Sequence, residues 1–89
     1  MISAGVTIIN KLGLHARAAS RLVNCASGFA ANIEIVRGTR SVNAKSIMGV
    51  LTLAAAIGTE LVIKADGPDD QQAVDALLAL FNDRFGEDE

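Results

Sequence analysis

The spacing of apolar residues changes several times along this chain, and these changes constrain its fold more than any other feature of the sequence. From Ile2 to Ile8 every second side chain is apolar, and the residues between them are serine, glycine and threonine, which predicts a strand with one buried face. From Ala16 to Ala26 the apolar residues recur at helical spacing, which predicts a helix that Gly28 is placed to end. The chain therefore begins with a strand and continues into an amphipathic helix.

The same two patterns return in the middle of the chain. Residues 33–35 and 41–43 predict two strands joined by a turn at residues 37–39, and residues 61–63 predict a last strand. Ser46 stands at the N-cap position before an apolar segment, which predicts a short helix between the third and fourth strands.

A third helix is predicted to close the chain. Pro68 belongs to a turn at residues 66–68 and is expected at the first position of this helix. The apolar residues that follow form one helical stripe, which consists of Val74, Leu77, Leu78, Phe81 and Phe85. The remaining residues, 86–89, are acidic or glycine, and we expect them to be solvated and frayed.

Together these segments predict the order β-α-β-β-α-β-α within 89 residues. A chain of this length builds one hydrophobic core, so we expect a single domain over residues 1–89. Helices and strands arranged in this way are typical of an α+β domain in which the helices cover one face of a sheet.

Composition excludes several classes of function. The chain has a net charge of −2 and neither tryptophan nor tyrosine, so it lacks the basic and aromatic surface of a nucleic-acid-binding protein. No apolar run approaches the ~20 residues of a membrane span, and residues 1–10 lack the pattern of a secretory signal. Cys25 has no partner for a disulfide, so we expect a packed, inert thiol in a cytoplasmic protein.

The stretch GLHARAASRLV, residues 13–23, contains the only histidine of the chain. A helix that begins just after His15 would present free N–H groups and a partial positive charge to the ring. These groups and Arg17 would favour a neutral, nucleophilic imidazole and would stabilise a phosphoryl group bound to it. On these residues alone two interpretations remain open, a phosphoryl acceptor or a surface histidine beside a solvated arginine. A metal site is not expected, because His15 and Cys25 lack further clustered ligands.

A second stretch, SVNAKSIMGVLTL at residues 41–53, is unusually apolar for a short helix. Some of its side chains are expected to fill the core. Because Ile47 and Met48 are adjacent, both cannot point inward, so at least one is expected to belong to an exposed apolar surface that docks a partner.

The stretches GLHARAA and KSIMGVLTL together resemble the HPr family, the histidine-containing phosphocarrier proteins of the phosphoenolpyruvate-dependent phosphotransferase system. The resemblance runs along the whole chain and includes its length and the residues at 10–15. It implies an HPr-like open-faced β-sandwich, in which a four-stranded antiparallel sheet of order 1-4-2-3 carries three helices on one face.

The resemblance implies a monomeric carrier that is not an enzyme and needs no cofactor or metal. His15 Nδ1 would accept a phosphoryl group from phospho-enzyme I and pass it to a histidine of an enzyme IIA domain, in sugar uptake or its regulation. Arg17 would hold the phosphoryl oxygens, and Ser46 would be a regulatory site for HPr kinase/phosphorylase. The surface that docks partners would comprise Ser20, Ile47, Met48 and Leu51.

Two alternatives to a sugar-uptake carrier stay open. One is a non-catalytic binding module controlled by phosphorylation of Ser46. The other is a carrier of the nitrogen-regulatory branch (NPr), which residues 80–82 and the acidic end resemble. The chain also departs from the family pattern at Ala18, where members usually carry proline, so the resemblance leaves the start of the first helix open.

Overall fold

The computed structural model describes residues 1–89 and contains one antiparallel sheet. β4 lies inside the sheet and pairs with both β1 and β2, which places Ile63 opposite Ala4 on one side and opposite Ile35 on the other. The strands lie in the order β1-β4-β2-β3, as the resemblance implies. Their bounds are β1 (Ile2–Thr7), β2 (Asn32–Arg37), β3 (Arg40–Asn43) and β4 (Glu60–Asp66).

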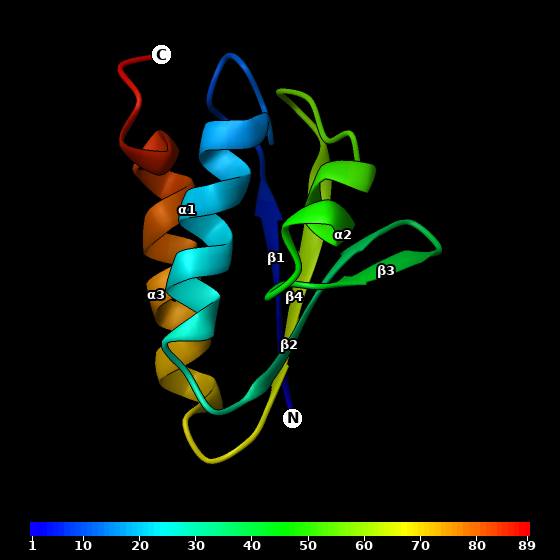
Figure 1. Ribbon diagram of the computed structural model, residues 1–89, viewed down its shortest axis with the longest axis vertical. Helices are drawn as coiled ribbons and strands as arrows, with labels where there is room; N and C mark the ends of the chain where they lie inside the picture. Colours follow the sequence, from blue (N-terminus) through cyan, green and yellow to red (C-terminus); the bar gives the residue numbers. More distant parts are fainter.

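The helices cover one face of this sheet (Figure 1), which confirms the predicted two-layer α+β arrangement. They are α1 (Ala16–Ser27), α2 (Ile47–Thr52) and α3 (Asp70–Asn82), and a single 3-10 turn, η1 (Arg84–Gly86), follows α3. Figure 1 shows α1 and α3 side by side, with the start of α1 and the C-terminus at the same end of the molecule. None of these helices combines the length and apolarity of a bilayer-spanning segment.

The core lies between the sheet and the helices, as the alternating strand pattern predicts. Ile33 and Ile35 of β2 are buried, whereas Asn32 and Glu34 are exposed and Val36 is half-buried. Leu22 of α1 and Leu77 of α3 are fully buried on the helical side. The core is thus aliphatic, and its only buried aromatic side chains are Phe81 and Phe85.

The predicted start of the closing helix is wrong. Pro68 lies outside α3, which begins at Asp70. Asp69 is the N-cap residue, and its backbone carbonyl accepts the N–H of Ala73 at 3.0 Å. Its carboxylate makes no cap bond and instead accepts the backbone N–H groups of Ala30 and Ala31 at 2.9 and 2.8 Å. A contact between two loops therefore determines where the helix begins.

The predictions for the end of the chain are also wrong in part. Phe85 is buried as predicted, but it belongs to η1, where its backbone has left-handed angles, and α3 ends at Asn82. The ring of Phe85 packs edge-on against Phe81, with the ring centroids 4.8 Å apart. Residues 86–89, expected to be frayed, instead lie against the start of α1, and the backbone N–H of Lys11 donates to the carbonyl of Glu89 at 2.9 Å.

Candidate functional site

The loop between β1 and α1 brings His15 to the start of its helix. Gly13 has a φ of +66°, and a side chain at this position would place its Cβ 2.4 Å from the carbonyl oxygen of Ala55. That carbonyl accepts the backbone N–H of Leu14 at 2.8 Å, and the Leu14 side chain is buried. Glycine is therefore required for the close approach of the two loops that fixes the position of His15.

His15 is the N-cap residue of α1, as the sequence predicts. Its carbonyl accepts the N–H of Ala19, whereas the backbone N–H groups of Ala16, Arg17 and Ala18 have no acceptor in the structure. The imidazole is 28% exposed, so a reacting partner can reach it. Ala18 is fully buried within the first turn, and α1 begins directly after His15 although the family's usual proline is absent.

A carboxylate lies against the His15 ring. Oε2 of Glu87 contacts Nε2 of His15, and Oε1 of Glu87 accepts a hydrogen bond from Nδ2 of Asn10 at 2.9 Å. The bond from Asn10 is the largest cause that holds the pKa of Glu87 below its usual range, and the contacts with His15 and the charge of Arg17 act in the same direction. The ring therefore faces a negative charge. The sequence-based expectation named only the positive charges of the helix N-terminus and Arg17.

Asn10 connects this carboxylate to the His15 loop. Its side chain is fully buried and is the only buried polar side chain of the protein. Its amide nitrogen donates to the Gly13 carbonyl at 2.8 Å as well as to Glu87. Glu87 is thus held from the interior of the molecule and is only 11% exposed.

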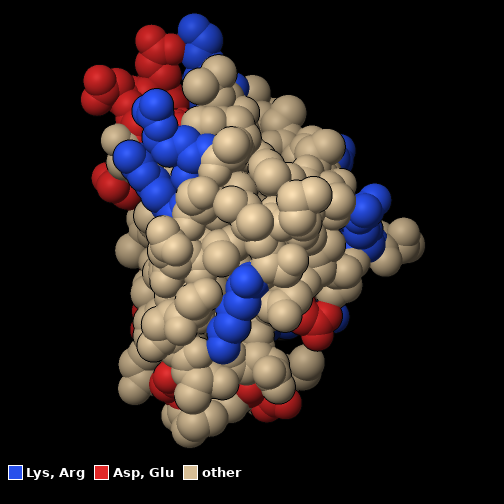
Figure 2. Space-filling view, viewed as in Figure 1, with Lys and Arg blue, Asp and Glu red and all other residues tan.

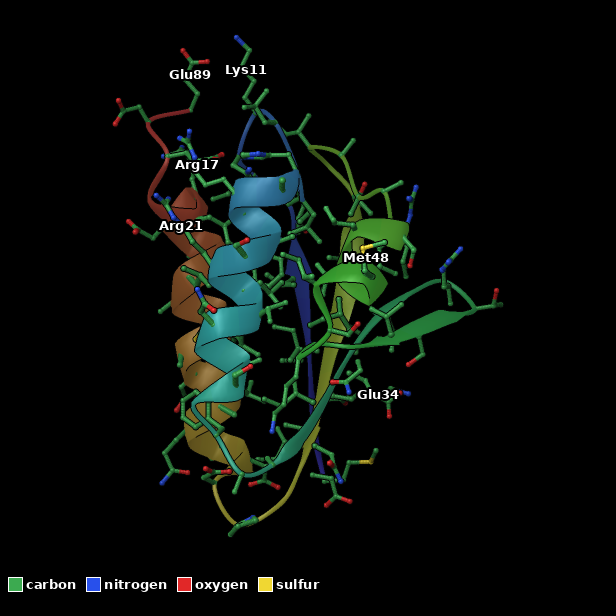
Figure 3. The ribbon with its side chains drawn as sticks, in the orientation of Figure 1. Lys11, Arg17, Arg21, Glu34, Met48 and Glu89 are labelled. Carbon is green, nitrogen blue, oxygen red and sulfur yellow. The ribbon has the colours of Figure 1, made fainter.

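A charged groove opens beside these residues. It has a volume of about 410 Å³ and is lined by Lys11, Leu12, Arg17, Arg21 and residues 86–89. Figure 2 shows basic and acidic side chains gathered at this end, whereas most of the face in view is uncharged. Figure 3 shows Arg17 and Arg21 on the side of α1 that faces the C-terminal segment.

The two arginines of the groove differ in what they contact. Arg21 donates to the carbonyl of Phe85 and so holds the C-terminal segment against α1. Arg17 is exposed and forms neither a salt bridge nor a side-chain hydrogen bond. Its guanidinium therefore remains available for an anion that binds near the ring.

α2 presents the second group of predicted residues. The hydroxyl of Ser46 accepts the N–H of Gly49 at 3.2 Å, so Ser46 is the N-cap of α2 as predicted. Ile47 and Met48 are both exposed, at 39% and 69%, and the core position of this helix is taken by Val50. The sequence predicts that at least one of these two adjacent side chains is exposed, and in the structure both are.

The other predicted docking residues lie on both sides of the contact between α1 and α2. Ser20 on α1 and Leu51 on α2 are half-buried, and the two helices pack against each other. Other exposed apolar side chains were not singled out from the sequence as part of a surface, among them Leu12 at 66% and Ile57 at 56% exposure. Both lie in loops, where helical or strand periodicity gives no signal.

Glu87 and Asn10 are the residues of the site that sequence reasoning missed. They are 77 positions apart in the chain, so no local pattern links them. One signal was available: the helical stripe ends at Phe85, and a buried aromatic side chain two residues before Glu87 anchors the segment that carries it.

Known proteins have a similar sequence and the same fold. A family model described as the PTS HPr component phosphorylation site matches residues 2–83. A phosphocarrier protein HPr of Cupriavidus necator is 54% identical over all 89 residues of both chains. A phosphocarrier protein NPr of Shewanella violacea is 45% identical over 82 residues, which cover 92% of this chain and 90% of that protein.

Solved structures agree with these relatives. A crystal structure of HPr-C-His from Thermoanaerobacter tengcongensis superimposes with a TM-score of 0.97 at 39% identity, and the match covers all of both chains. The matching motifs, sequence and fold therefore show that this chain belongs to the HPr family of phosphocarrier proteins of the phosphotransferase system, which are carriers and not enzymes.

Proposed function

We propose that Nδ1 of His15 accepts a phosphoryl group from phospho-enzyme I and then passes it to a histidine of an enzyme IIA domain in the cytoplasm. The observation that carries this proposal is the position of His15, a partly exposed ring at the N-terminus of α1. It lies beside the free backbone N–H groups of residues 16–18 and near the unpaired Arg17.

The chemistry of the site suits a reversible covalent carrier. A neutral imidazole nitrogen is a nucleophile, and the phosphoryl group that it acquires is an anion. Free N–H groups at a helix N-terminus and a guanidinium fork stabilise that anion without becoming bonded to it covalently. The phosphoryl group can therefore be held long enough for transfer and then released to the next histidine.

A labelling experiment tests this role directly. Wild-type protein incubated with enzyme I and phosphoenolpyruvate should acquire a phosphate that brief acid treatment removes, because the N–P bond of phosphohistidine is labile in acid. His15→Ala should take no label, since the chain has no other histidine. Ser27→Ala, an exposed change at the far end of α1, is the matched control and should be labelled normally. Acid-labile labelling of His15→Ala would contradict the proposal.

The acceptor of the phosphoryl group determines the pathway. A carrier for sugar uptake passes the group to an enzyme IIA of a sugar transporter, and a nitrogen-type carrier passes it to the regulatory counterpart. We propose that both kinds of partner dock on the apolar side chains of α2, since Ile47 and Met48 are exposed there. Transfer from labelled protein to each candidate enzyme IIA would distinguish the two pathways.

A second candidate function is regulation through Ser46. Its support is the exposed apolar surface directly after Ser46, where an added phosphate would lie among groups that a partner must desolvate. Incubation with ATP and an HPr kinase/phosphorylase should then give an acid-stable phosphate that is absent from Ser46→Ala. An acid-stable label that persists in Ser46→Ala would contradict this candidate.

A further inference from the structure

The contact between Glu87 and His15 restricts the chemistry of the ring. A carboxylate has only acceptor atoms, and a neutral imidazole has one N–H and one nitrogen with a free lone pair. Because Oε2 of Glu87 contacts Nε2, the proton of the neutral ring is held on Nε2. The lone pair is then on Nδ1, which accepts no hydrogen bond in the structure.

From this geometry we infer that Glu87 is a positioning residue that selects the ring tautomer in which Nδ1 of His15 is free to attack phosphorus. The inference rests on the proposed function, because it explains which nitrogen of that same ring reacts. Glu87 does not touch the phosphoryl group in this scheme and acts only through the ring.

Glu87 is held firmly enough to select a tautomer. Its second oxygen, Oε1, accepts from the fully buried amide of Asn10, which also donates to the carbonyl of Gly13. The backbone around Glu87 is fixed on both sides, by the buried ring of Phe85 and by the bond from Lys11 to the Glu89 carbonyl. A carboxylate fixed in this way loses little entropy when it accepts the hydrogen bond from the Nε2–H group.

The transfer step then balances without movement of the ring proton. The Nδ1 lone pair forms a bond to phosphorus, and the bond between phosphorus and the donor breaks with its electron pair retained by the donor. The proton stays on Nε2, so the His15 ring becomes cationic at the moment of transfer. The carboxylate of Glu87 faces that new charge at the opposite side of the ring from the phosphoryl group.

Glu87→Gln tests the inference because a side-chain amide can either donate to or accept from the ring and so selects no tautomer. The first readout is the nitrogen NMR spectrum of His15 labelled in the ring, recorded near pH 9 without enzyme I. Wild-type protein should show Nε2 protonated and Nδ1 free, and Glu87→Gln should show a mixture of both tautomers.

The second readout is the rate of phosphoryl transfer from enzyme I. We expect it to fall about tenfold in Glu87→Gln, similar to the loss of activity when a group that orients a metal-binding histidine is removed. Glu87→Asp keeps the carboxylate and should recover part of both the rate and the tautomer. Glu60→Gln is the matched control, because it makes the same change at an exposed carboxylate of β4 that forms no salt bridge and does not line the groove, and it should behave like wild type.

The outcomes separate the inference from the proposed function. Identical tautomer populations in wild type and Glu87→Gln would overturn the inference, as would an equal loss of rate in Glu60→Gln. Wild-type protein that accepts no phosphoryl group would overturn the proposed function, and the NMR spectra would still decide whether Glu87 selects the tautomer.

Discussion

His15 at the start of α1 and Met48 on α2 belong to two helices that pack against each other, but the protein holds them in different ways. The His15 ring contacts a carboxylate 72 positions away in the chain, and its loop is held by Asn10 and by the carbonyl of Ala55. Met48 is presented by a helix of six residues whose N-terminus is capped locally by Ser46. The proposed reacting group is thus held by contacts with distant segments, whereas the proposed docking residue is exposed and is held by a locally capped helix.

This difference suggests that the two regions respond differently to mutation. Changes in distant residues that support His15 should affect stability and phosphoryl transfer together. Changes on α2 should affect the binding of partners and leave the reactivity of His15 unaltered. The following predictions test that separation, beginning with the largest expected effect.

Phe85→Ala should destabilise the protein most, by about 3–5 kcal/mol, because it empties a fully buried site against Phe81. It should also release the C-terminal segment and with it Glu87, so the surviving folded protein should transfer phosphoryl groups more slowly. Urea unfolding measures the first effect, and transfer from enzyme I under folding conditions measures the second. A variant that is destabilised but transfers at the wild-type rate would show that His15 does not depend on this segment.

Arg17→Ala should slow transfer about tenfold, the effect expected when a charge-assisted hydrogen bond to the phosphoryl group is lost. The free energy of unfolding should change by less than about 0.5 kcal/mol, since Arg17 is exposed and unpaired. Arg17→Lys should restore only part of the rate, because lysine supplies charge without the planar fork. A normal rate in Arg17→Ala would leave this arginine without a role in transfer.

Ser46→Ala should cost about 1 kcal/mol of stability, because the N-cap bond to Gly49 is lost, and should leave transfer unchanged. Ser46→Asp should instead weaken the binding of enzyme I through a charge beside Ile47 and Met48, with a normal rate at saturating enzyme I. Stopped-flow transfer at several enzyme I concentrations separates binding from chemistry. If the defect of Ser46→Asp persisted at saturation, the two regions would not be independent.

Asp69→Asn should have the smallest effect and should be seen only in the pH dependence of stability. The bond from the Ala30 N–H, more than any other contact, lowers the pKa of Asp69 in the folded protein. Asp69 therefore stabilises the fold above the ordinary pKa of an aspartate, and this contribution is lost as the pH falls through the lowered value. Urea unfolding between about pH 6 and pH 3 should show a smaller acid loss for Asp69→Asn than for wild type.

The sequence could predict what depends on neighbours in the chain. The alternation around Ile33 and Ile35 predicts β2, and the helical spacing after His15 predicts α1 and the placement of the ring at its start. The cap at Ser46 follows from the same local rules. These features were predicted because the residues that decide them are a few positions apart.

The features that the sequence could not predict depend on contacts between distant segments. The carboxylate of Asp69 bonds to Ala30 and Ala31 rather than to an N–H of its own helix, and α3 begins after Asp69 rather than at Pro68. The Glu87 side chain contacts His15 and Asn10 instead of solvent. The acidic composition of residues 86–89 predicts only a solvated end and so gives no sign of these contacts. In both cases a carboxylate bonds to a loop that only the folded sheet brings near it.

The bond between Lys11 and Glu89 has a practical consequence for work with this protein. An affinity tag fused after Glu89 would emerge at the charged groove that Arg17 and Glu87 line, and would compete for the space that the proposed enzyme partner needs. A tag placed before Met1 would emerge at the opposite end of the molecule (Figure 1). We therefore expect protein with a C-terminal tag to transfer phosphoryl groups more slowly than protein with an N-terminal tag.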